Sequence, residues 1–529
     1  MVYTSPHPEI DIPDVSLTDF VLAGARERGD KPALIDGPGG RTITYGQLAE
    51  GVDRVAAGLA ARGFGKGDVA GLFSPNIPEF ALAFYGIAAA GGVVTTINSL
   101  ATEEDIAQQL SDSRARLLIT VPPFLDRAMP AAHKAGVEEV FVIGDAEEGT
   151  PFAALMAAEG PPPAVGIDPA EDLVTLPYSS GTTGFPKGVM LTHRNLVANI
   201  IQTAAGQRVR EDERLIAVLP FFHIYGMTVV MNLSLWRGAT LITMPRFELE
   251  PFLKLLQDQR ITRAYLVPPI VLALAKHPAV ERFDLSALEG IMSGAAPLGE
   301  GLQRACAERL GCMVMQGYGL TESSPVTHIT VDSPEWIRPG TIGRLVPNQE
   351  CRIVDPETGV DVEEGKDGEI WVRGPNVMRG YLNNPEATAA TVTSDGWLKT
   401  GDIGHADEEG YFTVVDRLKE LIKYKGYQVP PAELEAVLNS HPAVADAAVI
   451  GIPDDEAGEV PKAFVVLSQE VTPEDLMVYV ASHVASYKKV RAVEVVKEIP
   501  KSASGKILRR VLVAQERERA STSGGERTA

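Results

Sequence analysis

The most informative segment of the chain is Ser179-Ser180-Gly181-Thr182-Thr183-Gly184-Phe185-Pro186-Lys187-Gly188, which directly follows the apolar run Leu173–Tyr178. Its glycines let the backbone approach a ligand closely, and its hydroxyl groups and lysine are donors suited to phosphate oxygens. It is not the P-loop motif GxxxxGK, because Pro186 stands where the second glycine belongs. The segment therefore predicts a strand followed by a phosphate-binding loop of another kind.

Short strand-like runs alternate with helical ones on both sides of this loop. Thr42–Thr44 predicts a strand, and a helix follows in which Leu48, Val52, Val55 and Leu59 recur at helical spacing. The same order returns several times, with a helix at Pro78–Ala90 and strands at Val69–Ser74, Val93–Ile97, Leu215–Leu219, Thr240–Met244 and Arg263–Val267. This alternation predicts an α/β fold, a large domain of mixed sheets flanked by helices.

The sequence pattern changes twice toward the C-terminus. Glu350–Val354 and Gly368–Arg373 predict short strands of a small β-subdomain. After Asp416 the order of helices and strands predicts a small α+β domain, with helices at Pro431–Asn439 and Pro473–His483 and strands at Val444–Gly451, Ala463–Leu467 and Arg491–Val496. We expect a large domain at 1–416, a mobile small domain at 417–529, and disorder from Glu516 onward, where charged and small residues dominate.

Composition narrows the class of protein. The 529 residues are 45% hydrophobic, as in a globular protein with a large core, and carry a net charge of −22. This charge argues against a nucleic-acid partner and an anionic membrane surface. The apolar stretches Phe80–Ile97 and Ala217–Trp236 are interrupted by glycine or polar residues, so neither predicts a membrane span. Three cysteines without metal spacing and no visible targeting segment predict a reducing, cytoplasmic location.

Further blocks rich in polar and glycine residues follow in order along the chain. They are Gln316-Gly317-Tyr318-Gly319-Leu320-Thr321-Glu322, Thr400-Gly401-Asp402, residues 416–429 (DRLKELIKYKGYQV) and Ser504-Gly505-Lys506-Ile507-Leu508-Arg509. Together with the loop at 179–188, they resemble the motifs of the adenylate-forming superfamily. This superfamily includes acyl- and aryl-CoA synthetases, firefly luciferase and the adenylation domains of peptide synthetases. The resemblance extends from Tyr45 to Arg510.

The resemblance implies a reaction in two steps. A small-molecule carboxylic acid attacks the α-phosphorus of ATP in the presence of Mg²⁺, which gives an acyl-adenylate and pyrophosphate. The thiol of coenzyme A then attacks the acyl carbon, and AMP leaves. A carboxylate is a poor acyl donor because its leaving group would be oxide, whereas AMP is a stable anion. Because the first step brings an anion toward a polyanion, cationic groups should dominate catalysis.

The resemblance also assigns roles to residues. Lys506 is expected to bridge the carboxylate and the α-phosphate, and Glu322 to bind Mg²⁺. Lys423 and Gln428 are expected to serve the thioester step and adenylate binding, and Lys425 and Gly426 to bind CoA. Lys419 matches the hinge about which the small domain of relatives rotates between the two steps. The expected nucleotide-binding residues are Ser179, Ser180, Gly181, Thr182, Thr183, Gly184, Lys187, Gly294, Ala295, Ala296, Gln316, Gly317, Tyr318, Gly319, Thr321, Asp402 and Arg417.

The acid is the least determined part of the prediction. The run at 221–227 (FFHIYGM) resembles the pocket wall of the branch that holds 4-coumarate–CoA ligases and luciferase, and His223 is expected beside the carboxylate. The pocket positions of this branch correspond to His223, Tyr225, Gly294, Gly319, Pro325 and Val326. Near Thr228 and Val229, plant coumarate ligases carry more polar residues. We expect a CoA ligase for an aryl or hydrophobic acid, with 4-coumarate or a cinnamate-like acid as the first candidate and apolar aryl or medium-chain acids left open. A fatty-acyl-CoA synthetase, transfer to a carrier protein, a luciferase-like oxygenase and a non-catalytic nucleotide-binding protein remain alternatives. The sequence leaves monomer and homodimer open.

Overall fold

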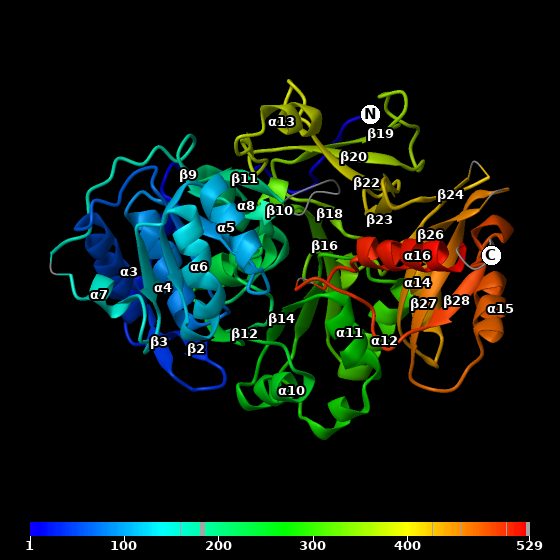
Figure 1. The fold of residues 1–529 in the computed structure, drawn as a ribbon, viewed down its shortest axis with the longest axis horizontal. Coiled ribbons are helices and arrows are strands. Elements are labelled where there is room, and N and C mark those ends of the chain that lie inside the picture. Colours follow the sequence, from blue (N-terminus) through cyan, green and yellow to red (C-terminus); the bar gives the residue numbers. More distant parts are fainter. Residues whose placement is uncertain (159, 180–185, 426, 455, 504, 525–529) are drawn as a thin grey trace.

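The chain folds into a large body and a smaller C-terminal domain beside it (Figure 1). The computed structural model describes residues 1–158, 160–179, 186–425, 427–454, 456–503 and 505–524. The mixed α/β architecture with a small α+β domain at its C-terminal end confirms the predicted fold class. None of the helices in these ranges is both long and apolar enough to cross a bilayer.

The first large sheet carries the phosphate-loop region at one edge. Its order is β10-β11-β9-β5-β4-β6-β7-β8, and β21 pairs with β11. Its strands are β4 (Val69–Phe73), β5 (Val93–Thr96), β6 (Ala115–Thr120), β7 (Glu139–Val142), β8 (Thr150–Pro151), β9 (Leu173–Thr175), β10 (Tyr178–Ser179), β11 (Lys187–Thr192) and β21 (Gly380–Tyr381). The predicted strand Leu173–Tyr178 is thus divided into β9 and β10. Pro177 lies at the break, where a proline cannot donate a ladder hydrogen bond.

The second large sheet has a parallel centre. Its order is β18-β17-β16-β15-β14-β12-β13-β2-β3, and every neighbouring pair from β16 to β2 is parallel. Its strands are β2 (Pro32–Asp36), β3 (Thr42–Thr44), β12 (Arg214–Ala217), β13 (Thr240–Thr243), β14 (Arg263–Leu266), β15 (Gly290–Ser293), β16 (Met313–Gly319), β17 (Val326–Ile329) and β18 (Arg344–Leu345). The parallel strands are buried along their length, as expected for a sheet covered by helices on both faces.

Two smaller sheets complete the fold. The predicted β-subdomain is an antiparallel sheet of order β1-β19-β20-β22-β23, with strands β1 (Tyr3–Thr4), β19 (Glu350–Val354), β20 (Gly368–Arg373), β22 (Leu398–Ala406) and β23 (Phe412–Arg417). The C-terminal domain has the order β25-β24-β27-β26, and β28 pairs with β27. These strands are β24 (Ile422–Tyr424), β25 (Tyr427–Val429), β26 (Val444–Asp454), β27 (Gly458–Leu467) and β28 (Ala492–Val495). The chain passes from one sheet to the other between Arg417 and Ile422.

Several helices begin directly after a residue whose side chain caps the first turn, among them α1, α3, α5, α8, α13 and α15. At α3, the Thr44 side chain accepts from the Gln47 N–H, and the Gln47 side chain accepts from the Thr44 N–H, which together form a capping box. The helices are α1 (Leu17–Leu22), α2 (Ala25–Arg28), α3 (Tyr45–Ala60), α4 (Pro78–Ala89), α5 (Glu103–Asp112), α6 (Leu125–Ala135), α7 (Ala153–Met156), α8 (His193–Gly206), the π-helix η2 (Tyr225–Asn232), α9 (Leu233–Arg237), α10 (Leu249–Asp258), α11 (Pro268–Lys276), α12 (Glu300–Leu310), α13 (Pro385–Thr391), α14 (Pro431–Ser440), α15 (Pro473–His483) and α16 (Arg509–Gly524).

The expectation of disorder from Glu516 onward is wrong for the described part of the tail. α16 continues through this region to Gly524. Leu512 is 2% exposed and belongs to an apolar cluster with residues of β26 and β27. The Glu516 carboxylate accepts a hydrogen bond from Lys462 Nζ at 2.7 Å. The charged composition therefore marks the exposed face of a docked helix.

Candidate active site

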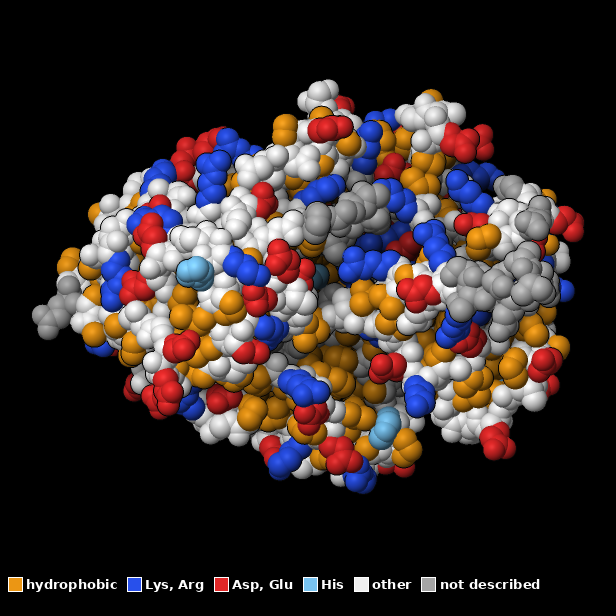
Figure 2. All heavy atoms as spheres, viewed as in Figure 1, with side chains coloured by type: hydrophobic (Ala, Val, Ile, Leu, Met, Phe, Trp, Pro, Cys, Tyr) orange, Lys and Arg blue, Asp and Glu red, His pale blue; other side chains and the backbone are white. Residues whose placement is uncertain are grey.

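A cavity of ≈ 2380 Å³ lies at the carboxyl ends of the parallel strands of the second large sheet. His223 follows β12, Pro268 follows β14, Ala295 follows β15, and Gly319 ends β16, and all four line the cavity. Parallel α/β sheets bind ligands at this edge because the loops that follow neighbouring strands converge there. The C-terminal domain closes another side of the cavity with Lys506. In Figure 2, Lys and Arg side chains gather at the junction of this domain with the large body.

The structure brings most of the predicted site residues to this one cavity. Among the described residues, its lining includes Ser179, Lys187, His223, Ala295, Ala296, Gln316, Gly317, Tyr318, Gly319, Thr321, Glu322, Asp402, Arg417, Lys419 and Lys506. Ser180, Gly181, Thr182, Thr183, Gly184 and Gly426 lie outside the described residues, so their predicted roles stay predictions. The lining does not include Tyr225, Gly294, Pro325, Val326, Lys423, Lys425 or Gln428.

Asp402 and Arg417, both expected to bind the nucleotide, form an ion pair on neighbouring strands. Asp402 of β22 pairs in register with Arg417 of β23, and Arg417 Nε lies 3.4 Å from Asp402 Oδ1. The Tyr318 hydroxyl donates to Asp402 Oδ2 at 2.5 Å. Burial raises the pKa of Asp402, and the charge of Arg417 opposes this rise. The pair therefore presents a supported carboxylate that can accept hydrogen bonds from sugar hydroxyls.

Glu322 lies at the phosphate-loop edge of the cavity, in contact with a residue that the sequence analysis missed. Its Oε1 accepts from the Ser179 hydroxyl at 2.8 Å and from the Tyr381 hydroxyl at 2.9 Å. Lys187 Nζ lies 4.9 Å from the centre of the Tyr381 ring. Tyr381 reaches this place because β21 pairs with β11, a long-range contact that no local motif indicates.

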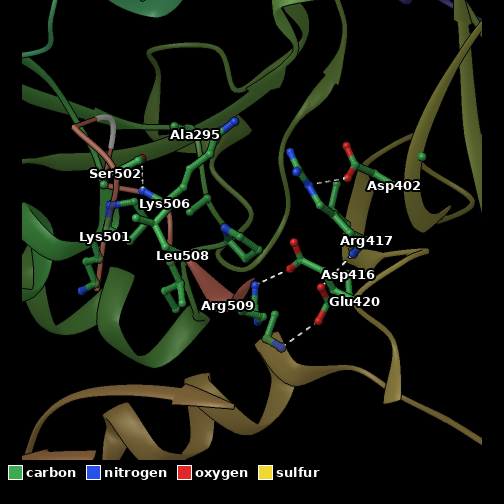
Figure 3. Close-up of a pocket in the computed structure, with 18 of the residues that line it drawn as sticks. Ala295, Asp402, Asp416, Arg417, Glu420, Lys501, Ser502, Lys506, Leu508 and Arg509 are labelled. Atoms are coloured by element: carbon green, nitrogen blue, oxygen red, sulfur yellow. Dashed lines mark hydrogen bonds and ion pairs between the residues drawn. The ribbon is translucent and has the colours of Figure 1, made fainter. Parts of the chain in front are cut away.

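Lys506 enters the cavity on the segment that precedes α16. Its turn is closed by backbone contacts with Ser502, whose hydroxyl accepts from the Lys506 N–H at 3.1 Å and whose N–H donates to the Lys506 carbonyl at 2.8 Å. Burial and then the charge of Arg417 lower the pKa of Lys506, while Asp402 and Glu322 oppose them. Figure 3 shows Lys506 on one side of the pocket and the Asp402–Arg417 pair on the other.

His223 is a neutral donor in the same cavity. Burial, with the nearby charge of Lys506, lowers the pKa of His223 to about 3. Its Nδ1 accepts a hydrogen bond from the Tyr225 N–H at 3.3 Å. The ring proton is therefore assigned to Nε2, which suits a carboxylate oxygen.

Of the expected acyl-pocket residues, His223 and Gly319 line the cavity, and Tyr225, Gly294, Pro325 and Val326 pack behind its wall. A Cβ added at Gly294 would lie 3.0 Å from the Tyr225 ring, and one at Gly319 would lie 2.1 Å from the Pro325 carbonyl oxygen. Val326 pairs with Gly319 in the antiparallel pair of β17 and β16. Both glycines thus permit close packing, and the surrounding wall is aromatic and aliphatic.

The residues expected to serve the second step lie elsewhere. Lys423 of β24 and Gln428 of β25 are cross-strand partners, and both side chains are exposed. Lys425 is also exposed and forms an ion pair with Glu456. Lys419 lies in the connection between β23 and β24, which is where a hinge is expected. To act at the cavity, the β24–β25 hairpin would have to be carried there by a turn of the whole C-terminal domain.

A buried ionic cluster beside this connection was also missed. Arg509 Nη2 lies 2.8 Å from both carboxylate oxygens of Glu435, and Arg509 also pairs with Glu420. Asp416 Oδ2 accepts from the Ala432 N–H at 2.8 Å. Burial raises the pKa of Glu435 to about 7, and Arg509 opposes this rise. The cluster joins α14, α16 and the connection, as Figure 3 shows for Arg509 and Glu420.

A second domain that inserts a lysine into a nucleotide-type cavity of a larger α/β domain is the arrangement of an adenylate-forming enzyme. The chain belongs to the family of AMP-binding enzymes. The model of that family matches residues 22–382, and the model of the AMP-binding enzyme C-terminal domain matches residues 433–506. Both matches confirm the resemblance inferred from the sequence.

Curated relatives match almost the whole chain. The chain is 45% identical over 526 residues to 4-coumarate–CoA ligase 5 of Oryza sativa subsp. japonica, with 97% of each chain covered. It is 42% identical over 527 residues to 4-coumarate–CoA ligase 2 of Petroselinum crispum, again with 97% of each chain covered.

Solved structures also align with nearly the whole chain. The anthranilate CoA ligase AuaEII in complex with anthranoyl-AMP has a TM-score of 0.89 at 28% identity, with 96% of this chain and 98% of that chain covered. A benzoate CoA ligase from Burkholderia xenovorans LB400 has a TM-score of 0.85 at 27% identity, with 94% and 99% covered.

Proposed function

We propose that the protein is an ATP-dependent, AMP-forming CoA ligase that converts an aromatic, cinnamate-like carboxylic acid to its acyl-CoA through an acyl-adenylate. The observation that carries the proposal is the meeting of Lys506, His223 and Asp402 at one cavity, although these residues come from different parts of the fold. The near full-length similarity to 4-coumarate–CoA ligases supports the substrate class.

The first step uses the groups present at the cavity. Asp402, with Arg417 beside it, accepts from the ribose hydroxyls and fixes the nucleotide. The neutral His223 donates from Nε2 to one carboxylate oxygen of the acid and orients the other toward the α-phosphorus. Lys506 stabilises the negative charge that gathers between the carboxylate and the phosphate as the acyl–phosphate bond forms and pyrophosphate leaves.

A divalent cation fits the phosphate side of the cavity. Glu322 offers a carboxylate beside Ser179 and Lys187. The described residues hold no cluster of three or more acidic, His or Cys side chains that could bind a metal by themselves, so the cation would need other ligands as well. Mg²⁺ suits such a place because it takes one or two carboxylates and completes its shell with water and substrate phosphates. When bound with ATP it would neutralise phosphate charge, and Glu322 would be its protein ligand.

The second step requires a different set of residues at the adenylate. The thiol of CoA attacks the acyl carbon, a thioester bond forms, and the bond to AMP breaks. Lys423 and Gln428 are the proposed groups for this step, and Lys425 with Gly426 for CoA binding. Because Lys423 and Gln428 are exposed outside the cavity, the proposal includes a rotation of the C-terminal domain at Lys419 between the steps.

The residues directly behind the cavity wall favour an aromatic acid over an amino acid. Tyr225 packs against Gly294, and Pro325 and Val326 pack against Gly319, so this layer is aromatic and aliphatic. The run at 221–227 offers no Asp to pair with a substrate amine, so a free amino acid is disfavoured.

The test is release of AMP from ATP with a panel of acids, with and without CoA. Cinnamate-like and benzoate-like acids should give the highest kcat/KM, and the acyl-CoA should appear in equal amount to AMP. A Lys506→Met variant controls for contaminating activity. Higher kcat/KM with medium- or long-chain fatty acids would replace the aryl assignment, and release only with an acyl carrier protein would replace CoA. No release with any acid would overturn the proposed function.

A further inference from the structure

Lys276 lies in the wall of the same cavity and binds the C-terminal domain. It is the last residue of α11 in the large body, and its ammonium contacts backbone carbonyls of the C-terminal domain. Nζ lies 2.6 Å from the carbonyl oxygen of Asn439, 3.2 Å from that of Val444 and 3.4 Å from that of His441. The carbonyls of Asn439 and His441 belong to the last turn of α14 and its C-cap, where helix carbonyls lack intrahelical partners and favour a cation, and the carbonyl of Val444 belongs to the first residue of β26.

The C-terminal domain also contacts the other end of α11. A Cβ added at Gly505 would lie 2.9 Å from a methyl group of Val267, the residue that precedes α11. A further contact joins the start of α12 to α14, because a Cβ added at Gly299 would lie 3.2 Å from the Cβ of Ala436. The Lys506 segment therefore docks at the start of α11 while Lys276 holds α14 at its end.

We infer that Lys276 is a positioning residue for the first half-reaction, because its contact with the end of α14 holds the C-terminal domain in the orientation that brings Lys506 to the cavity. This inference rests on the proposed function. Among the described residues, the Lys276 ammonium hydrogen-bonds to backbone carbonyls of the C-terminal domain and to no side chain there, so the contact joins the two domains through the backbone around the end of α14. Lys423 reaches the cavity only when the domain leaves this orientation, so the second half-reaction does not need the contact.

The test compares the two half-reactions in a Lys276→Met variant, which keeps the apolar stem and removes the ammonium. Acid-dependent exchange of pyrophosphate into ATP should fall roughly tenfold, as for the loss of a charged hydrogen bond. Transfer from preformed acyl-adenylate to CoA should be unchanged or faster. A Lys276→Arg variant should recover most of the exchange. The matched control is Lys254→Met, an exposed lysine of α10 that pairs with Asp258 in its own helix.

Equal losses in both half-reactions, or no loss in either, would overturn the inference. A second measurement makes the result independent of activity. Spin labels at Lys254 in the large body and at the 70% exposed Val478 of α15 report the distance between the domains. Lys276→Met should broaden this distance distribution in the protein without substrates, and an unchanged distribution would overturn the inference. If wild-type protein exchanges no pyrophosphate with any acid, the proposed function fails, and the label distances decide the role of Lys276.

Discussion

Replacing Lys506 by Met should abolish most of the first half-reaction and leave the fold intact. The turn that carries Lys506 is closed by the N–H and carbonyl of Lys506 with Ser502, so the substitution removes none of these contacts. No ion pair among the described residues uses the Lys506 ammonium, whereas Arg417 is engaged by Asp402. Lys506→Met therefore removes the interaction of the Lys506 ammonium with the carboxylate and the α-phosphate of the substrates.

The size of this loss follows from the setting of the ammonium. One unit charge about 4 Å from another, at an effective dielectric constant of about 20, is worth ~4 kcal/mol. Loss of one preorganised donor in other enzymes costs about 3–4 kcal/mol, or roughly 10²–10³ in rate. Lys506→Met should thus slow acid-dependent pyrophosphate exchange by about 10²–10³, with an unchanged midpoint of thermal unfolding.

The matched control for this assay is the Lys423→Met variant. Lys423 is exposed and outside the cavity in this structure, so its loss should leave pyrophosphate exchange near the wild-type rate. It should slow the transfer of a preformed acyl-adenylate to CoA in single-turnover experiments. If Lys506→Met and Lys423→Met reduce both half-reactions by the same factor, the division of roles between the two lysines is refuted.

Three further results are expected. Gly319→Ala should lower both the midpoint of thermal unfolding and the rate of AMP release, because the new Cβ would lie 2.1 Å from the Pro325 carbonyl oxygen. The control is Gly301→Ala, whose Cβ would meet nothing within 4 Å. Equal unfolding midpoints of the two variants would contradict the prediction. Glu322→Gln should raise the Mg²⁺ concentration for half-maximal AMP release roughly tenfold at an unchanged unfolding midpoint; an unchanged Mg²⁺ requirement would exclude Glu322 as the metal ligand. Burial lowers the pKa of His193 from 6.5 to about 4, so the stabilisation from its neutral form is complete above pH 6.5 and is lost as the pH falls toward 4. Over this pH range, the free energy of unfolding measured in urea should fall by about 3 kcal/mol less in His193→Asn than in the wild type. Parallel pH profiles of the two proteins would contradict the assignment.

Local pattern was enough to predict many of the elements. The helix that follows Thr44 and strands such as Glu350–Val354 lie where the sequence places them, because their determinants are a few residues apart. The ends of elements were less accurate. β27 begins at Gly458, five residues before the predicted start, because its pairing with the long β26 extends it.

The C-terminal tail shows where local pattern fails. Residues from Glu516 onward have a composition typical of disorder, yet α16 includes them as far as Gly524. The stabilising contacts are long-range: Leu512 packs into a cluster with β26 and β27, and Glu516 pairs with Lys462. The charged and small residues of this segment form the exposed face of α16, and its composition does not indicate the contacts of the other face.

The sequence by itself determined the class of chemistry through the resemblance of its ordered motifs to the adenylate-forming superfamily, because each motif is a contiguous segment; the residue types of the loop alone indicated a phosphate site. Only the tertiary structure decided which side chains meet. In the folded chain, Tyr381 hydrogen-bonds to Glu322 and Lys276 hydrogen-bonds to the end of α14. Lys506 lines the cavity, whereas Lys423 does not. These meetings depend on strand pairing and domain docking between residues up to hundreds of positions apart, and a local spacing of residues carries no record of such contacts.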